Sequence, residues 1–242
     1  MLPTLKRLYL DLSTGAFRTM KTNNVVVKAN VLIEASYRLT LNEQRLILLA
    51  ISKVNPLEKL TEGRLFSVSV DEWMSCYECS YSSANEAIKE AEYTLFERQV
   101  TLLVGEDSIK TRWVQSIRYY KRQGKIGIRF AYDLLPYLAE LNSHFTTYKI
   151  KEICDLSSIY SVRLFEMISQ FKDINKSRYF VIRVDDFKNR LGIQGEYPLF
   201  ANLKQKVIEV AVNQIKEHTE FKNIKYELEK EGRKVVRLVF FF

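Results

Sequence analysis

Hydrophobic and polar residues change from strand spacing to helical spacing near residue 184, and this change organises the second half of the chain. The apolar alternation of Val181-Ile-Arg-Val184 indicates a short strand with one buried face. An Asp-capped helix over 185–191 should follow, then Gly192, a second helix over 199–218, and two strands joined by Glu231-Gly232. Strand, helix, turn, helix and hairpin in this order predict a winged helix-turn-helix.

The helix predicted over 199–218 has two different faces. One arc should pack against the core and consists of Leu203, Val207, Val210, Ala211 and Gln214. The opposite side, called the reading face below, consists of Asn202, Gln205, Lys206, Glu209 and Asn213. Asn and Gln can bond adenine bidentately, Lys can bond guanine and Glu can accept from cytosine, so this face suits the DNA major groove. An ordinary solvated helix face is equally polar, and both interpretations stay open.

The first half of the chain repeats the same plan. Phe66-Ser-Val-Ser-Val-Asp-Glu-Trp73 aligns without a gap with Phe180-Val-Ile-Arg-Val-Asp-Asp-Phe187, which indicates an internal repeat. Before it, a capping box of Thr40 and Glu43 should start a core helix that runs to about residue 54. After it we expect a helix over 83–98 with a capping box at Ser83, and strands over 100–104, 112–121 and 125–132. A short helix over 133–141, an extended connector over 146–150 and a helix over 157–171 complete the prediction.

Positive charge gathers on the hairpin predicted to turn through Gln123-Gly124. The stretch from residue 110 to 129 contains no acidic residue and seven basic ones, namely Lys110, Arg112, Arg118, Lys121, Arg122, Lys125 and Arg129. Such a wing would contact phosphates, which position a protein on a duplex without reading its sequence. A solvated hairpin tip is the alternative. The second wing is mixed, because Lys230, Arg233 and Lys234 lie beside Glu227, Glu229 and Glu231.

The predicted helix over 83–98 occupies the groove-reading position of the first unit but is net negative. We therefore expect the first unit to touch DNA mostly through its wing, at Arg118, Lys121, Arg122 and Lys125, or to serve as a dimer interface. The second unit should read bases through Asn202, Gln205 and Lys206. Lys204, at the edge of the packed arc, together with Arg233 and Lys234, should contact phosphates.

Composition supports a folded chain with a polyanionic partner. The 242 residues are 47% hydrophobic and carry a formal net charge of +8, which favours nucleic acid. The three cysteines and the lack of a secretory signal favour a reduced, cytoplasmic protein, and Cys76-x-x-Cys79 lacks the partner pair that a zinc site needs. No apolar run approaches the roughly 20 residues of a membrane span. We predict no metal, cofactor or membrane partner.

Three segments resemble a known family. The segment 27–51, with its Leu41-Asn-Glu-Gln-Arg45 core and aliphatic helix, resembles the opening signature of the iteron-type plasmid replication initiator proteins, and 160–166 and 203–215 are similar to their second domain. The resemblance implies an α+β fold of two tandem winged-helix domains, which we place at 25–150 and 151–242 after an extension, 1–24, that it does not cover. It further implies binding to directly repeated origin sequences as a monomer, replication with host helicase and initiator proteins, and repression of the protein's own promoter as a dimer. Gln205 departs from a frequent Arg of the family, which puts the base preference there in doubt.

Two other functions remain as alternatives. A winged-helix transcriptional regulator would need only the same groove helix and wing, and the sequence does not separate it from an initiator. A nicking or nucleotide-hydrolysing replication enzyme would need a His cluster with a Tyr nucleophile or a Gly-x-x-x-x-Gly-Lys phosphate loop. The sequence has only two histidines and no such loop, so we expect a binding protein without enzymatic activity.

Overall fold

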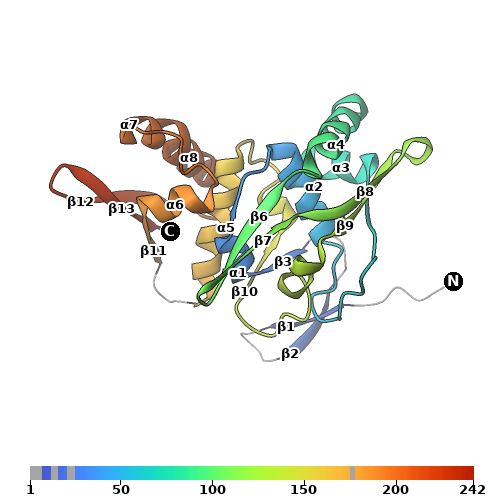
Figure 1. Cartoon of the computed structure of the whole chain (residues 1–242). Coiled ribbons are helices and arrows are strands. Elements are labelled where there is room, and N and C mark those ends of the chain that lie inside the picture. The colour runs from blue at the N-terminus through green and yellow to red at the C-terminus, as the bar shows by residue number, and fades with distance from the viewer. Residues whose placement is uncertain (1–6, 12–15, 21–24, 175–177) are drawn as a thin grey trace.

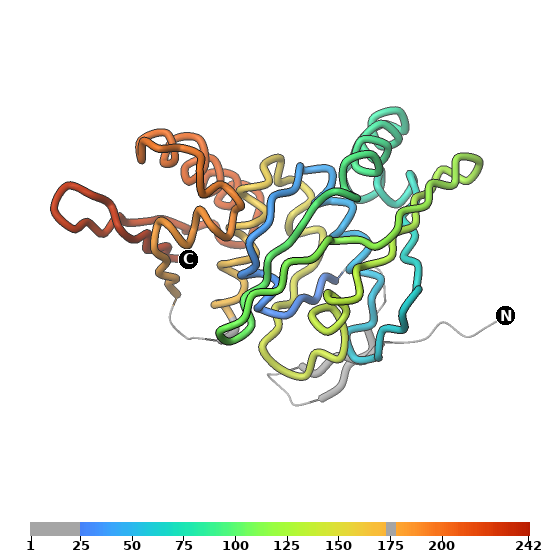
Figure 2. The backbone as a smooth tube through the Cα atoms, in the orientation of Figure 1, coloured from blue at the N-terminus to red at the C-terminus, as the bar shows by residue number. Residues whose placement is uncertain are grey.

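The computed structural model describes residues 7–11, 16–20, 25–174 and 178–242, and it places the two halves of the chain side by side (Figure 1). In the expected extension, β1 (Arg7–Asp11) pairs antiparallel with β2 (Ala16–Met20). The rest of residues 1–24 lies outside the described residues. Figure 2 follows the backbone from the first half, in blue to yellow, into the second half, in orange and red.

The first half combines helices with three small sheets. Its helices are α1 (Asn30–Glu34), α2 (Leu41–Ile51), α3 (Val70–Tyr77), α4 (Tyr81–Leu95) and the 3-10 helices η1 (Lys121–Gln123), η2 (Tyr132–Tyr137) and η3 (Ile150–Glu152). Its strands are β3 (Val25–Ala29), β4 (Ser36–Tyr37), β5 (Phe66–Ser69), β6 (Gln99–Val104), β7 (Asp107–Arg112), β8 (Val114–Tyr120), β9 (Lys125–Phe130) and β10 (Phe145–Lys149). The sheet orders are β10-β3, β4-β6-β7 and β5-β9-β8.

The second half forms one three-stranded sheet and a helical layer. Its helices are α5 (Ile159–Ile174), α6 (Val184–Arg190), α7 (Phe200–Leu203), the π-helical segment η4 (Lys204–Ile208) and α8 (Glu209–His218). Its strands are β11 (Tyr179–Arg183), β12 (Lys225–Glu231) and β13 (Lys234–Phe241), in the sheet order β11-β13-β12.

The two halves share one plan, as the internal repeat predicts. In each half a helix (α2 or α5) precedes a short strand, two helices and a hairpin, and the last strand of the hairpin lies in the centre of the sheet. The registers also correspond, because Phe66 of β5 pairs with Ile128 of β9 and Phe180 of β11 pairs with Phe240 of β13. The fold is therefore a tandem of two winged-helix units, and the predicted α+β class is confirmed.

Helix α2 forms the core of the first unit, and its N-terminus is fixed by the predicted capping box. Thr40 Oγ1 accepts a hydrogen bond from the Glu43 amide at 3.2 Å, and the Glu43 carboxylate accepts one from the Thr40 amide at 2.6 Å. The same carboxylate is fully buried and accepts a hydrogen bond from Arg98 Nε at 2.8 Å. Residues 46–51 are all buried, so the helix has almost no solvated face in its second half.

Several local predictions are wrong in instructive ways. The N-cap of α4 is Ser80 rather than Ser83, because Ser80 Oγ accepts from the Ser83 amide at 3.2 Å. The N-cap of α6 is Arg183 without a side-chain cap, so Asp185 lies in the first helical turn and is not the capping residue. The predicted helix over 133–141 is the shorter 3-10 helix η2. The segment predicted as an extended connector over 146–150 is extended, and the prediction missed only that it pairs with β3 as strand β10.

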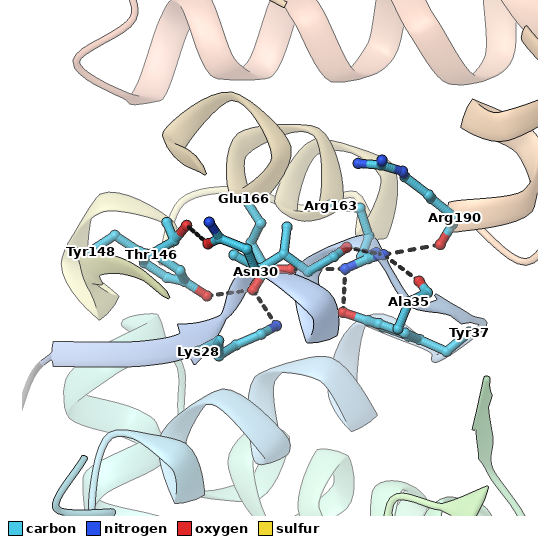
Figure 3. Close-up of polar contacts among 10 residues, drawn as sticks. Lys28, Asn30, Ala35, Tyr37, Thr146, Tyr148, Arg163, Glu166 and Arg190 are labelled. Carbon is cyan, nitrogen blue, oxygen red and sulfur yellow. Dashed lines mark hydrogen bonds and ion pairs between the residues drawn. The ribbon is translucent and has the colours of Figure 1, made fainter. Parts of the chain in front are cut away.

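A buried polar network joins α5 to β3, β4 and β10 of the first half (Figure 3). Glu166 of α5 accepts hydrogen bonds from Lys28 Nζ and from the Tyr148 hydroxyl, each at 2.6 Å, and lies 3.2 Å from Arg163 Nη1. Burial alone would raise the pKa of Glu166, but the charges of Lys28 and Arg163 outweigh it and lower the pKa. The carboxylate is therefore ionised and held by two cations in the interior.

Arg163 is the member of this network that touches most segments. Its guanidinium donates to the carbonyl oxygens of Ile33 at 2.9 Å, Ala35 at 3.0 Å and Arg190 at 3.0 Å, and it also bonds the Tyr37 hydroxyl. The side chain is only 1% exposed. One arginine thus ties the segment around β4 in the first unit to α5 and the end of α6 in the second.

Candidate nucleic-acid interface

The second unit presents its reading helix as one continuous element built from α7, η4 and α8. The backbone runs without a break from residue 200 to 218, as the sequence predicts, but η4 (Lys204–Ile208) has π-helical hydrogen bonding. Leu203, Val207 and Ala211 of the predicted packed arc are each at most 1% exposed. Val210 and Gln214 are only half-buried. Ile208, Val212 and Ile215 are buried although the helical wheel leaves them out, so the packed arc is wider than predicted.

The reading face lies on the outside of this helix. Gln205, Lys206 and Asn213 are exposed, while Asn202 and Glu209 are half-buried. Lys204 Nζ lies 3.6 Å from the Glu209 carboxylate, which bridges η4 and α8. Burial and the neighbouring Glu209 also raise the pKa of Tyr226 on β12, so Glu209 lies toward the wing. The side chains left open for a partner are those of Gln205, Lys206 and Asn213.

Contacts with α5 fix the orientation of the reading helix. The Gln214 side-chain oxygen accepts hydrogen bonds from the amides of Ser157 and Ser158, both at 3.1 Å, and its nitrogen donates to Ser157 Oγ at 2.8 Å. These amides lie just before α5, and the side-chain cap of α5 itself is Ser158, whose Oγ accepts a hydrogen bond from the Tyr160 amide at 3.2 Å. Gln214 therefore fixes the reading helix to the two residues that lead into α5.

The wing of the second unit is the hairpin of β12 and β13. Arg233 and Lys234 are exposed at its tip, where Gly232 turns the chain with a φ of +61°. Arg237 pairs with Glu229 at 3.1 Å across the two strands. The charges of this wing are mixed, as predicted, and the hairpin of β12 and β13 extends away from the body of the unit (Figure 1).

The wing of the first unit is the hairpin of β8 and β9, closed by η1. Arg118, Lys121 and Arg122 are exposed, and Lys125 is half-buried with its Nζ 4.9 Å from the centre of the Tyr120 ring. In the part of the chain that the structure describes, none of these four cations has an ion-pair partner. The Tyr119 hydroxyl donates to Asn85 of α4 at 2.9 Å, which holds the base of the wing against the helix.

The prediction that seven basic residues lie together on one hairpin is wrong. Trp113 is fully buried and separates β7, which carries Lys110 and Arg112, from β8, and β7 belongs to another sheet. Arg112 pairs with Glu97 at 3.1 Å and stacks 4.7 Å above the Phe96 ring. Arg129 is at the foot of the wing and donates to the carbonyl of Gly63 at 2.8 Å. The four basic residues that remain on β8, η1 and β9 are called the basic wing below, namely Arg118, Lys121, Arg122 and Lys125.

The helices in the reading position of both units project from the same side of the molecule, and the two wings extend toward opposite ends (Figure 1). The outward side of α4 carries Glu86 and Glu90 beside the strongly exposed Tyr93, which is 87% accessible. This acidic face would repel phosphates, whereas the reading face of the second unit would not. The arrangement favours one base-reading helix with a basic wing on the other unit.

In the described residues, no helix is long and apolar enough to cross a membrane. Across the same residues, no group of three or more His, Cys, Asp or Glu side chains is arranged to hold a metal ion.

Comparison with known families gives two matches that together span most of the chain. The model of the family "Initiator Replication protein, WH1" matches residues 25–169. The model "Initiator Rep protein, WH2" matches residues 183–242. Both matches describe winged-helix units, in agreement with the two copies seen in the fold.

Individual proteins show the same similarity. The chain is 26% identical over 238 residues to the PI protein of Escherichia coli, with 85% of this chain and 78% of that protein covered. It is 27% identical over 225 residues to a replication initiation protein of Escherichia coli, with 89% of this chain and 68% of that protein covered. A crystal structure of the Pi initiator protein in complex with iteron DNA superposes with a TM-score of 0.76 at 24% identity, covering 91% of this chain and 97% of that one. That likeness shows the shared fold.

Proposed function

We propose that this chain, which belongs to the Initiator Replication protein family, starts plasmid replication by binding directly repeated sequences of double-stranded DNA at an origin. The resemblance predicted from residues 27–51, 160–166 and 203–215 is confirmed by the family models. Relatives named as replication initiators, and one solved in complex with iteron DNA, support the choice of repeated origin DNA as the ligand.

The observation that carries the proposal is the exposed part of the reading face. Gln205, Lys206 and Asn213 extend from a helix whose other side is buried in the core, so its position is rigid. Amide and ammonium groups are the donors that read adenine and guanine edges in the major groove. Two amides and one cation on the exposed side of one helix therefore suit base reading better than simple attraction to phosphates.

The basic wing would supply the affinity that does not depend on sequence. Arg118, Lys121, Arg122 and Lys125 can approach phosphates without first breaking an ion pair within the described residues, so each contact would release counterions from the duplex. Lys204, Arg233 and Lys234 lie beside the reading face and would add phosphate contacts near the bases that are read. The basic wing holds the protein on the duplex and the reading face selects the site.

The family membership favours an initiator over a transcriptional regulator with no replication role. It also favours action by binding rather than by strand nicking, for which the sequence offers no histidine cluster. An initiator of plasmid replication must reach plasmid DNA, and we infer a cytoplasmic location on that ground.

We further propose that the protein self-associates and that it acts with host proteins. Leu103 and Val104, at the end of β6, are 64% and 38% exposed, and β7 is an unpaired edge strand of its sheet within the described residues. Exposed apolar groups beside a free strand edge favour pairing with another copy. A dimer of this kind would repress the protein's own promoter, and the monomer would act with host helicase and initiator proteins at the origin, as the resemblance implies.

Footprinting of the purified protein over the region upstream of its own gene tests the proposal. We expect protection of several direct repeats spaced by about two helical turns, so that bound copies share one orientation. Protection of one inverted repeat alone would instead support the regulator. Equal protection of all sequences at moderate salt would overturn sequence-specific binding altogether.

A further inference from the structure

The fold brings two cysteines from distant parts of the chain together. Cys76 lies in α3, Cys154 follows η3, and their Sγ atoms are 2.8 Å apart although 78 positions separate them in sequence. Both residues are free thiols and both are half-buried. A disulfide holds its sulfur atoms at about 2.05 Å, so only a small closing movement separates this pair from a covalent bond.

The groups around the pair make its two members unequal. The hydrogen bond with Cys154 lowers the pKa of Cys76, and the charges of Arg45 and Lys151 act in the same direction. The same hydrogen bond, together with burial, raises the pKa of Cys154. The Arg45 guanidinium lies 4.5 Å above the ring of Tyr77, next to Cys76 in the chain. Because the thiolate is the nucleophile, Cys76 is the residue that should react first.

We propose that Cys76 and Cys154 form a redox-active dithiol, a modification site at which hydrogen peroxide converts the two thiols into a disulfide. The Cys76 thiolate attacks one peroxide oxygen, the O–O bond breaks, and the departing oxygen leaves as water after protonation. The resulting sulfenic acid is attacked by the Cys154 sulfur, which forms the S–S bond. The sulfenic hydroxyl leaves as a second water with the proton of Cys154. The two sulfurs are oxidised by two electrons in total, and the peroxide is reduced to two waters.

The disulfide would link α3 to the segment that leads from η3 into α5. Cys76 is in the first helix of the first unit's helix-turn-helix, and Cys154 lies just before Ser157 and Ser158, which bond Gln214. The bond would close a long loop and so stabilise the fold. This site is independent of the proposed DNA binding, because neither cysteine lies on the reading face or on the basic wing.

The full chain is first reduced, freed of reductant and treated with hydrogen peroxide. Remaining thiols are then blocked with an alkylating agent, and intact mass and peptide mapping are used to count and locate them. We expect two of the three thiols to be lost, a peptide pair linking Cys76 with Cys154 and recovery of all three thiols with dithiothreitol. The proposal would be overturned if all three thiols were still alkylated after peroxide treatment. It would also be overturned by a disulfide that contains Cys79 or that joins two chains. The unsubstituted protein suffices for this test.

Three serine variants then assign the roles. Cys79→Ser is the matched control, because this residue is also half-buried but has no hydrogen bond to either sulfur among the described residues, and it should form the disulfide at the unsubstituted rate. Cys154→Ser should accumulate a sulfenic acid at Cys76 that a dione probe labels. Cys76→Ser should be labelled several-fold less at Cys154. Equal labelling of the last two variants would show that Cys76 is not the residue attacked by peroxide.

Discussion

Gln214 of the reading helix accepts a hydrogen bond from the amide of Ser157 at 3.1 Å and returns one to its hydroxyl at 2.8 Å. Two elements that are 57 positions apart in sequence are thereby fixed to each other at one point. The helix that carries the reading face is thus held in a defined position against α5, which also carries Arg163 and Glu166 of the buried polar network.

Replacing Gln214 should therefore cost stability. Gln214→Ala removes the hydrogen bonds to Ser157 and Ser158, and their loss should lower the free energy of unfolding by about 1 kcal/mol. Asn213→Ala is the matched control, because the Asn213 side chain is exposed and has no hydrogen bond within the described residues. Urea unfolding measures both variants. Equal midpoints would show that the Gln214 hydrogen bonds do not contribute to stability.

Substitutions on the reading face and on the basic wing should have different effects on DNA binding. Lys206→Ala should weaken binding to the specific site and reduce discrimination by roughly 1–3 kcal/mol, because a base contact is lost. Arg122→Ala should weaken binding to all sequences about equally and make the salt dependence shallower by about one unit. Competition titrations with specific and random duplexes at two salt concentrations measure both effects. If the two variants behave alike, the proposed division between face and wing is wrong.

The buried ion pair of Lys28 with Glu166 should contribute more to stability than an exposed ion pair. Lys28→Met leaves Glu166 buried with Arg163 as its remaining cation, and the expected loss is about 3 kcal/mol of unfolding free energy. Lys172→Met breaks the exposed pair of Lys172 with Glu220, and such pairs contribute at most about 1 kcal/mol. Chemical denaturation separates the two cases. A loss for Lys28→Met as small as that for Lys172→Met would mean that solvent reaches the network.

The lowered pKa of Glu166 makes the stability depend on pH in a defined direction. A carboxyl whose pKa is lower in the folded protein than its ordinary value of 4.5 stabilises the fold at every pH above that value. The contribution is lost as the pH falls through the folded pKa. We therefore expect the unfolding free energy of the unsubstituted protein to fall more steeply than that of Glu166→Gln below about pH 4.5. Parallel curves in urea titrations at a series of pH values would contradict this assignment.

Gly192 and Gly232 have similar φ angles but different surroundings. Substituting each of them therefore distinguishes the cost of backbone strain from the cost of a packing clash. Gly192 has a φ of +66°, and a Cβ there would lie 2.7 Å from the carbonyl oxygen of Tyr37 in the first unit. Gly232 has a φ of +61° with nothing within 4 Å of the same position. Gly232→Ala should therefore cost about 1 kcal/mol from the backbone alone, and Gly192→Ala about 3 kcal/mol because backbone of the other unit must also move. Thermal and urea unfolding of both variants check the difference.

The sequence allows the elements and their repetition to be predicted, but not the contacts between the two copies. Phe66 and Phe180 align by local pattern, and each pairs with the corresponding position of its own sheet. Lys28 and Glu166, in contrast, are 138 positions apart, and Lys28 belongs to a strand whose pattern gives no sign that a charged residue is buried. Long-range ion pairs leave no periodic signal, so the network of Figure 3 could not be foreseen.

The errors within the candidate interface have similar causes. The seven basic residues between 110 and 129 look continuous in sequence, but the buried Trp113 moves the chain from one sheet to another and divides them. Ser80 and Ser83 are both acceptable caps, and the acid at residue 86 makes the wrong one look better. The exposure of Gln205, Lys206 and Asn213 could be predicted because it follows from the helical period, whereas the half-burial of Asn202 and Glu209 could not.

The placement of both reading-position helices on one side of the molecule has a consequence for assembly. A duplex held there would leave the opposite side of the molecule facing outward. Copies on successive repeats would then display the same outer surface at intervals set by the DNA. A protein with several matching binding sites could bind such a regular array multivalently. A single bound copy would not allow this.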